Sequence, residues 1–179
     1  MPFDEHDPAA LHAALRSPEP GDAAPIWHLA RRSGALDDNS SYAYALLCTH
    51  FSDTCIVAEE HDAIVGFVVG YRPPRAADTL FVWQVTVASS HRGRGLGRKM
   101  LSRLVARDAL ADVRFLEATV TPSNVASRRL FTAAARELDA PCDVQRFFGP
   151  DVFPETGHEP EDLFRIGPFT TASPRRDHH

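Results

Sequence analysis

The chain has 179 residues, of which 44% are hydrophobic and 24% are charged, as is typical of one soluble globular domain. Its net charge of −5 argues against a dedicated nucleic-acid-binding protein, and no apolar run approaches the roughly 20 residues of a membrane span. The acidic N-terminus lacks the apolar core of a signal peptide, and the three cysteines form no C-x-x-C motif, which favours a reducing compartment. We therefore expect a cytoplasmic protein with no membrane partner and no nucleic-acid partner.

Turn residues and hydrophobic periodicity divide the chain into strands and helices. We expect an N-terminal arm over residues 1–7, a single domain over 8–169 and a loose tail over 170–179. The predicted elements, in chain order, are a strand over 11–16, helices over 22–33 and from 41 to about 50, strands over 54–60, 63–71 and 79–88, a helix from the glycine-rich stretch to about 111, a strand over 114–120, a helix over 125–135, and strands over 144–148 and 163–167. Ser40 or Ser41 is expected to cap the second helix and Ser123 the last one.

The strand predicted over 79–88 is the longest, and its alternation indicates one shared face. The side chains expected on that face are Phe81, Trp83, Val85 and Val87. The strand–helix–strand unit over 79–120 implies a parallel pair, whereas the hairpin over 54–71 is antiparallel. The fold class that follows is α/β (α+β), with a mixed central β-sheet flanked by helices.

Charge is distributed unevenly along the chain. Residues 33–71 contain six acids and no Lys or Arg, residues 79–107 contain six bases and no acid, and residues 151–162 contain five acids and no Lys or Arg. A basic centre between two acidic stretches indicates an anionic ligand that binds beside a cationic one. The alternative is a pair of solvated faces of opposite sign.

A glycine-rich loop, Arg92–Gly97, lies between a predicted strand and a predicted helix. Its three glycines permit positive φ and close backbone approach. Successive backbone N–H groups, together with the positive end of the following helix, would form a cradle for a pyrophosphate. The loop lacks the G-K-[ST] of a Walker motif, and its G-x-G-x-G spacing differs from the dinucleotide-binding fingerprint. A plain glycine-rich turn is the alternative.

Two motifs together resemble a known superfamily. The loop, read as Arg-x-x-Gly-x-Gly after a long strand, resembles the acyl-CoA signature of the GCN5-related N-acetyltransferases, and residues 124–131 resemble that superfamily's next motif at the usual separation. The resemblance covers roughly residues 8–167. Three further blocks narrow it, because they are similar to the diaminobutyrate acetyltransferase family rather than to the superfamily in general: residues 36–55, 81–87 and 153–166.

The resemblance implies acetyl-CoA as cosubstrate and direct attack by an amine in a ternary complex. The pantetheine arm would lie along the long strand, and a backbone N–H near its end would polarise the thioester carbonyl. The residues expected to hold the cofactor are Val85, Thr86, Val87, Arg92, Gly93, Arg94, Gly95, Leu96, Gly97 and Asn124. Alternatively, the valines are simply core and Asn124 is a helix cap. Many superfamily members have a tyrosine that protonates the leaving thiolate at the position of Phe131, whose phenyl ring cannot do so.

The resemblance also implies diaminobutyrate, with one carboxylate and two amines, as the acceptor. Acidic side chains would contact its ammonium groups and aromatic side chains would form a wall. The expected substrate-binding residues are Asp37, Asp38, Tyr42, Trp83 and Glu161. A protonated amine cannot attack, so His158 and Glu161 are the candidate catalytic residues, with the histidine accepting the proton directly or through water. In the alternative interpretation the aspartates cap a helix, the aromatic residues pack, and the histidine is a surface residue.

Three functions remain open from the sequence. The first is acetylation of the γ-amine of L-2,4-diaminobutyrate, a step that the family resemblance assigns to ectoine biosynthesis under osmotic stress. The second is acetylation of another small diamine or diamino acid. The third, which Phe131 keeps open, is a non-catalytic acyl-CoA-binding module. The resemblance also implies a homodimer, and the histidines show no metal-ligand spacing, so no metal is expected.

Overall fold

The computed structural model describes residues 13–34, 36 and 39–170 of the chain. Each predicted helix and strand has a counterpart in it, in the expected order. The helices are α1 (Ala23–Ser33), α2 (Ser41–His50), α3 (Leu96–Val105) and α4 (Val125–Glu137). The strands are β1 (Ala14–Arg16), β2 (Ile56–Glu60), β3 (Ala63–Tyr71), β4 (Thr79–Val87), β5 (Phe115–Val120), β6 (Cys142–Phe148) and β7 (Glu161–Ile166).

The seven strands form one sheet in the order β1-β2-β3-β4-β5-β7-β6. All neighbours are antiparallel except β4 and β5, which run parallel, so the predicted mixed sheet is confirmed. The parallel pairing is short: it joins Thr79–Phe81 to Phe115–Glu117 and goes no further. Beyond Phe81 the two strands separate, and within the described residues β4 continues with β3 as its sole strand partner. The sheet is therefore split at its centre.

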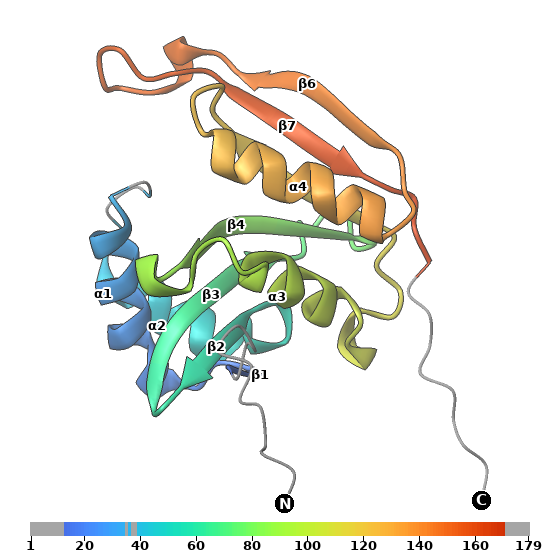
Figure 1. Ribbon diagram of the computed structural model, residues 1–179. Coiled ribbons are helices and arrows are strands. Elements are labelled where there is room, and N and C mark those ends of the chain that lie inside the picture. The colour runs from blue at the N-terminus through green and yellow to red at the C-terminus, as the bar shows by residue number, and fades with distance from the viewer. Residues whose placement is uncertain (1–12, 35, 37–38, 171–179) are drawn as a thin grey trace, which may run out of the picture.

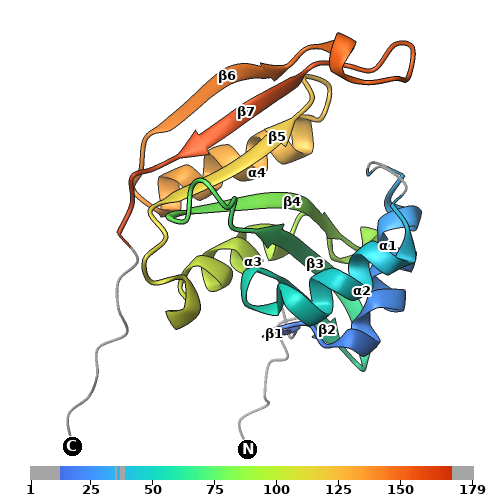
Figure 2. The same cartoon turned by 180° about the vertical axis from the view of Figure 1, so that it is seen from behind.

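Two helical layers cover opposite faces of the sheet, as the two ribbon views show (Figures 1 and 2). The α1 and α2 layer packs on β2 and β3 through one buried cluster, whose largest members are Ile26, Tyr44 and Phe67. The α3 and α4 layer covers the other face through a second cluster that includes Leu80, Met100, Leu104, Leu116, Phe131 and Ile166. Burial of each such side chain stabilises the fold by about 1.5–3 kcal/mol. The packing of both helical layers therefore stabilises the sheet although β4 and β5 pair only briefly.

A β-bulge in β4 overturns the predicted alternation. Gly70 pairs with Val82 and Val69 pairs with Gln84, which leaves Trp83 as an extra residue. An extra residue reverses the direction of the side chains that follow it. Leu80, Val82, Val85 and Val87 therefore face the α3 and α4 layer, whereas Trp83 lies over Tyr44 on the α1 and α2 side. The expectation that Phe81, Trp83, Val85 and Val87 share one face was wrong.

Helix α3 is shorter than predicted. It ends at Val105 rather than near residue 111, because Arg107 is extended and its guanidinium donates to three backbone carbonyls before β2, the shortest bond reaching Cys55 at 2.6 Å. Leu110 is still fully buried, on a short 3₁₀ turn. No helix in the described part of the chain is both long and apolar enough to cross a bilayer.

Candidate active site

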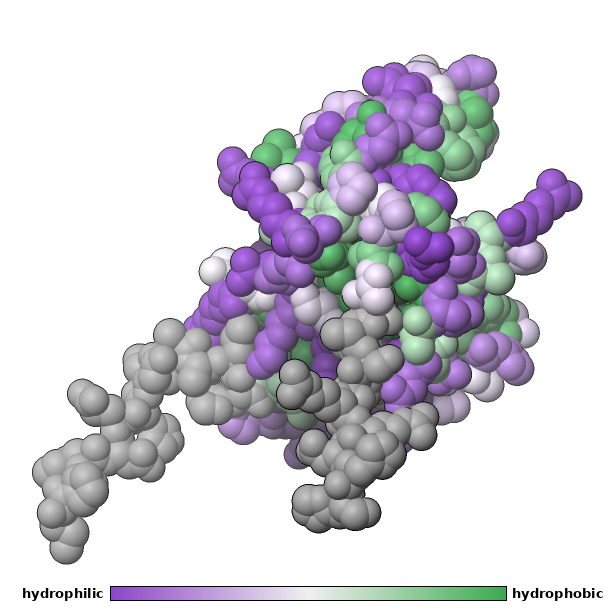
Figure 3. Space-filling view, turned by 90° about the vertical axis from the view of Figure 1, so that its right-hand side faces the viewer, coloured by the Kyte–Doolittle hydropathy of each residue, from purple (hydrophilic) through white to green (hydrophobic). Residues whose placement is uncertain are grey.

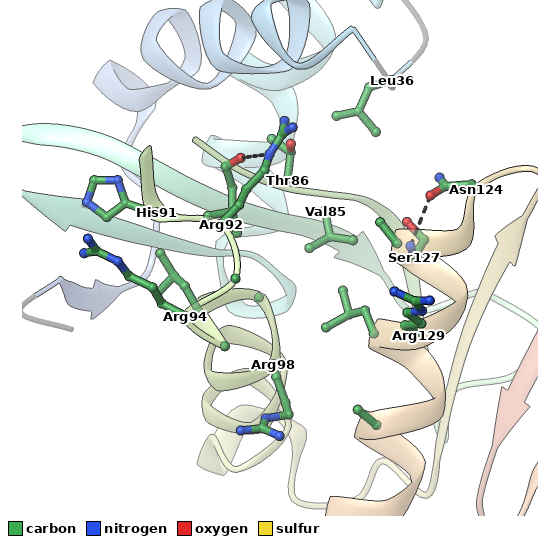
Figure 4. A pocket seen from close by; sticks show the side chains of 18 residues that line it. Leu36, Val85, Thr86, His91, Arg92, Arg94, Arg98, Asn124, Ser127 and Arg129 are labelled. Atoms are coloured by element: carbon green, nitrogen blue, oxygen red, sulfur yellow. Dashed lines mark hydrogen bonds between the residues drawn. The ribbon is translucent and has the colours of Figure 1, made fainter. Parts of the chain in front are cut away.

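A cleft of about 750 Å³ lies where β4 and β5 separate. Its walls come from Val85–Val87 at the end of β4, from residues 91–98 in the glycine loop and the start of α3, and from residues 124–133 in α4. Figure 4 shows Arg92 and Arg94 on one side, and Asn124, Ser127 and Arg129 on the other. All ten residues expected to hold the cofactor line this one cleft.

The glycine loop adopts the conformation expected of a cradle at two of its three glycines. Gly93 has φ +77° and Gly95 has φ +76°, and both lie in the left-handed region that favours glycine. Gly97 differs: it lies inside α3 with an ordinary φ, and an added Cβ would touch Leu130 at 3.5 Å. The third glycine therefore provides close packing of α3 on α4 rather than positive φ.

The first turn of α3 lines the cleft with the N-terminal end of the helix. Gly95 is the N-cap, and no side chain caps the helix or places an acid in its first turn. The first backbone N–H groups of the helix therefore have no intrahelical acceptor, and they carry the positive end of the helix dipole. Such an N-terminus beside a glycine loop binds phosphate-like groups.

Arginine side chains make the rim of the cleft cationic. Arg92 Nε donates to the carbonyl oxygen of Val87 at 3.0 Å and so ties the loop to β4 (Figure 4). Arg98 is paired with Glu137 at 2.8 Å. Arg94 and Arg129 have no ion-pair partner among the described residues, so their charge is available to a ligand.

Asn124 performs two roles at once. Its Oδ1 accepts a hydrogen bond from the Ser127 backbone N–H at 3.1 Å and caps α4, and the residue also lines the cleft. The helix-cap interpretation of Asn124 is therefore confirmed, and its contact with the cofactor stays a prediction. The expectation that Ser123 caps this helix was wrong, because Ser123 Oγ instead donates to a carboxylate oxygen of Glu159 in the loop before β7.

A smaller cavity of about 60 Å³ continues between the separated strands. Its lining includes Trp83 and Gln84 from β4 and Thr119 from β5. Trp83 is 38% exposed and its ring stacks on Tyr44 with a centroid separation of 6.4 Å. Sequence reasoning missed Gln84, although a polar residue inside an apolar strand was a usable sign of a special role.

Three other predicted site residues, Tyr42, His158 and Glu161, lie outside the two cavities. Tyr42 is 69% exposed near the start of α2, and neither His158 nor Glu161 contributes to either lining. His158 stacks on Phe153, with ring centroids 3.7 Å apart, and its Nδ1 lies 2.5 Å from the carbonyl oxygen of Glu159. The loop that carries His158 reaches the start of α4 through the bond between Glu159 and Ser123.

The predicted aspartates, Asp37 and Asp38, lie outside the described residues. Leu36, which precedes them in the chain, lines both cavities. One acid that sequence reasoning did not select, Asp162, follows Glu161 in β7. It pairs with Arg146 and Arg128, and the hydrogen bond from Arg146 above all holds the pKa of this carboxyl below its usual value.

Comparison with known proteins identifies the family. Residues 23–135 match the acetyltransferase (GNAT) family. The L-2,4-diaminobutyric acid acetyltransferase of Shouchella clausii is 49% identical over 155 residues, which are 87% of this chain and 86% of that protein. The chain belongs to the L-2,4-diaminobutyric acid acetyltransferase family. The corresponding protein of Nocardia farcinica is 49% identical over 157 residues, which are 88% of this chain and 81% of that protein.

Solved structures agree with this membership of the diaminobutyrate acetyltransferase family. The diaminobutyrate acetyltransferase of Paenibacillus lautus, in complex with L-2,4-diaminobutyric acid and coenzyme A, superposes with a TM-score of 0.86 at 48% identity, covering 92% of this chain and 100% of that one. An acetyltransferase from Salmonella typhimurium with acetyl-CoA shares the fold at 21% identity and a TM-score of 0.68, covering 92% of this chain and 99% of that one. The predicted family, fold class and acetyltransferase activity are confirmed.

Phe131 occupies the position at which many members of the superfamily have a tyrosine. It is buried, packs against Phe164 with ring centroids 6.1 Å apart, and also borders the smaller cavity. A phenyl ring at this place supplies apolar contact and no proton.

Proposed function

We propose that the chain transfers the acetyl group of acetyl-CoA to the γ-amine of L-2,4-diaminobutyrate by direct attack in a ternary complex. The observation that carries the proposal is the 48% identity and 0.86 TM-score to a diaminobutyrate acetyltransferase in complex with that amino acid and coenzyme A. Within the family resemblance, the reaction is a step of ectoine biosynthesis under osmotic stress.

The large cleft fits the acyl donor. On one side the backbone of Val85–Val87 pairs with β3. On its other side it has no partner strand among the described residues, so it offers hydrogen bonds to a pantetheine arm. The loop from Arg92 to Gly97 and the first turn of α3 offer N–H groups and positive charge to the pyrophosphate. Open space at Gly93, where an added Cβ would meet no atom within 4 Å, leaves room for close approach. Asn124 adds a polar contact from α4.

The acceptor would bind at the β4–β5 end of the cleft. Trp83 borders the smaller cavity there and offers an aromatic face to an ammonium group. Tyr42 would complete the aromatic wall. Asp37 or Asp38, which follow the cleft-lining Leu36 in the chain, and Glu161 would contact the ammonium groups.

His158 is the proposed general base. A backbone carbonyl can only accept, so the Nδ1 of His158 must carry the proton that it donates to Glu159. In the neutral imidazole, Nε2 then keeps its lone pair and can accept a proton. Removing the proton of an alkylammonium with a pKa near 10.4 at pH 7 costs about 4–5 kcal/mol, which is why a base is needed. Glu161 would orient the amine for this transfer.

His158 first takes the proton of the substrate ammonium, directly or through water. The neutral amine nitrogen bonds to the acetyl carbon, and a backbone N–H near Val87 stabilises the oxyanion. The carbon–sulfur bond then breaks and coenzyme A leaves as a thiolate. The proton that the nitrogen still carries after attack passes to water, because His158 already holds the proton of the ammonium. Phe131 cannot donate a proton, so the thiolate takes its proton from another group or from water.

The proposal is tested by thiol release from acetyl-CoA with L-2,4-diaminobutyrate, with the product assigned by NMR. We expect γ-acetylation, and we expect His158→Gln and Glu161→Gln to lower kcat/KM by about 10²–10⁴-fold, the range for general acid–base groups. Asp151→Asn, in the same acidic loop, is the matched control and is expected to retain activity. Release of thiol with a different diamine only would favour the second candidate function. An intact thioester with every amine, in protein that binds acetyl-CoA, would favour the binding module.

We also propose a cytoplasmic homodimer. Strand β6 is an edge strand with β7 as its partner on one side, and Val144 and Phe147 are exposed large hydrophobic residues on it. Apolar and polar side chains lie side by side at the top of Figure 3, the height at which β6 lies in Figure 1. The free thiols of all three cysteines support a reducing compartment. Light scattering of the wild type and of Phe147→Glu tests the dimer, which this charge is expected to weaken.

A further inference from the structure

A buried polar pair connects α2 to the bulge in β4. The hydroxyl of Tyr44 donates a hydrogen bond of 2.7 Å to Oε1 of Gln84, and both side chains are buried. Tyr44 comes from α2, so this bond links the helical layer to the strand residue next to the bulge. In a low-dielectric interior such a bond is strong, and the loss of one partner is penalised. The pair therefore fixes the local position of β4.

Trp83 depends on the same tyrosine. As the extra residue of the bulge, Trp83 has no counterpart in the register between β3 and β4. Its ring stacks on the ring of Tyr44, with centroids 6.4 Å apart and planes 25° apart. Tyr44 thus holds Gln84 through its hydroxyl and supports Trp83 through its ring.

The other side of the bulge is held by β3. A Cβ at Gly70 would lie 2.5 Å from the carbonyl oxygen of Phe81, so the two backbones approach as closely as glycine allows. The carbonyl of Gly70 accepts from Thr54 Oγ1 at 2.7 Å, which fixes β3 in turn. With β3 fixed, the Tyr44–Gln84 bond determines how the bulged segment of β4 is presented.

We propose that Tyr44 and Gln84 are positioning residues that orient Trp83 at the acceptor end of the cleft and thereby set the affinity for the amine substrate. This inference rests on the proposed function. Trp83 and Gln84 line the smaller cavity, and neither they nor Tyr44 line the large cleft that fits the acyl donor. Their effect is therefore confined to the acceptor side.

The kinetic test uses Tyr44→Phe, which removes one hydroxyl and keeps the ring. We expect the KM for diaminobutyrate to rise about five- to tenfold, the equivalent of one lost hydrogen bond, while the KM for acetyl-CoA changes by less than about twofold. The matched control, Thr79→Val, removes a buried hydroxyl at the other end of β4 and is expected to leave both KM values unchanged. Equal changes in both KM values for Tyr44→Phe, or a fall in Tm alone, would overturn the proposal.

A second readout follows Trp83 itself and needs no turnover. The chain has two tryptophans, so Trp27→Phe leaves Trp83 as the single fluorophore. In that background we expect Tyr44→Phe to change acrylamide quenching of Trp83, and Thr79→Val to leave it unchanged. An unaltered quenching constant in the Tyr44→Phe protein would contradict a positioning role. If instead the wild type fails to acetylate diaminobutyrate, the proposed function fails while the quenching result still stands.

Discussion

The guanidinium of Arg92 reaches back to the carbonyl oxygen of Val87 at 3.0 Å, and so joins the glycine loop to the last residue of β4. This bond spans the place where an acyl thioester would pass from the anion loop to the strand. It fixes the relative position of the two parts of the cleft that the donor would contact. The arginine is therefore expected to act both as a positive charge and as a brace.

Replacing Arg92 separates these two effects. We expect Arg92→Ala to raise the Kd for acetyl-CoA about tenfold, because a charge-assisted hydrogen bond and a cationic group are lost together. Arg92→Lys keeps the charge but loses the guanidinium geometry, so its Kd for acetyl-CoA is expected to lie between those of the wild type and of Arg92→Ala. Calorimetric titration with acetyl-CoA measures each Kd, and its repetition at a second salt concentration measures the contribution of the charge. Arg98→Ala is the control, since Arg98 is already paired with Glu137; an equal effect there would refute a special role for Arg92.

The two glycines Gly95 and Gly97 are expected to respond oppositely to alanine. Gly95→Ala forces a side chain into the left-handed region at φ +76°, a strain of about 1–2 kcal/mol. Gly97→Ala adds no such strain and gains about 1 kcal/mol of helix propensity, but its methyl group projects toward Leu130 in the cleft wall. Thermal denaturation and acetyl-CoA binding are expected to show a less stable Gly95→Ala and a stable, weakly binding Gly97→Ala. If both variants lost stability, the left-handed φ of Gly95 would not explain the effect of its substitution.

Acid stability is expected to depend on Asp22. Its carboxylate accepts from two guanidinium nitrogens of Arg16, at 2.7 and 2.9 Å, and these bonds hold its pKa below the usual value, while burial opposes them. Because the folded-state pKa is lowered, the stabilisation is present above the unfolded pKa of about 3.9 and is lost as pH falls through the folded value.

Asp22→Asn is therefore expected to lower the free energy of unfolding by about 1–2 kcal/mol at pH 7 and to flatten its decline below about pH 4. Urea denaturation from about pH 2 to about pH 7 measures both effects. Asp112→Asn is the control: its partner Arg72 also lowers the Asp112 pKa, but the carboxylate is exposed and screened by solvent. An unchanged pH profile in Asp22→Asn would contradict the assignment.

The three cysteines are expected to differ in reactivity. Burial raises the pKa of Cys48 to about 12 and that of Cys55 to about 11. Partial desolvation also raises the pKa of Cys142, but this residue is exposed on β6 and so is accessible to a reagent. Since the thiolate is the reactive form, we expect one thiol to react quickly with a disulfide reagent near pH 8 in the folded protein, and all three in denaturant. Cys142→Ser is expected to abolish the fast phase. A remaining fast phase would mean that the α1 and α2 layer opens readily.

Periodicity and turn chemistry predicted the order of helices and strands well, because each amphipathic segment is decided by its own sequence. The cap of α2 is an example: Ser40 Oγ accepts from the Ala43 backbone N–H. The choice between Ser123 and Asn124 as the cap of α4 was not decidable in this way. Both residue types are good helix caps. The choice depends on a long-range contact, because Ser123 Oγ donates to the carboxylate of Glu159 and leaves Asn124 to cap the helix.

The bulge at Trp83 was also invisible in the sequence. An apolar strand with one extra residue still looks regular in the sequence. Only the register against β3 shows where the side chains change from one face of the sheet to the other. The residues that line the large cleft could be predicted to lie together because most of them are consecutive in the glycine loop and in the strand. The acceptor site could not be assembled, because His158 lies in a loop without periodicity whose contacts with α4 are long-range.

The split between β4 and β5 gives the molecule a strand edge in its interior. Exposed strand edges invite pairing with other chains and aggregation. Here the edge beyond Phe81 lies in the cleft between the glycine loop and α4, and these two elements flank it where another strand would have to pair. Amide hydrogen exchange along the end of β4 should therefore be fast in the empty protein and slow with the donor bound, without any change in the association state.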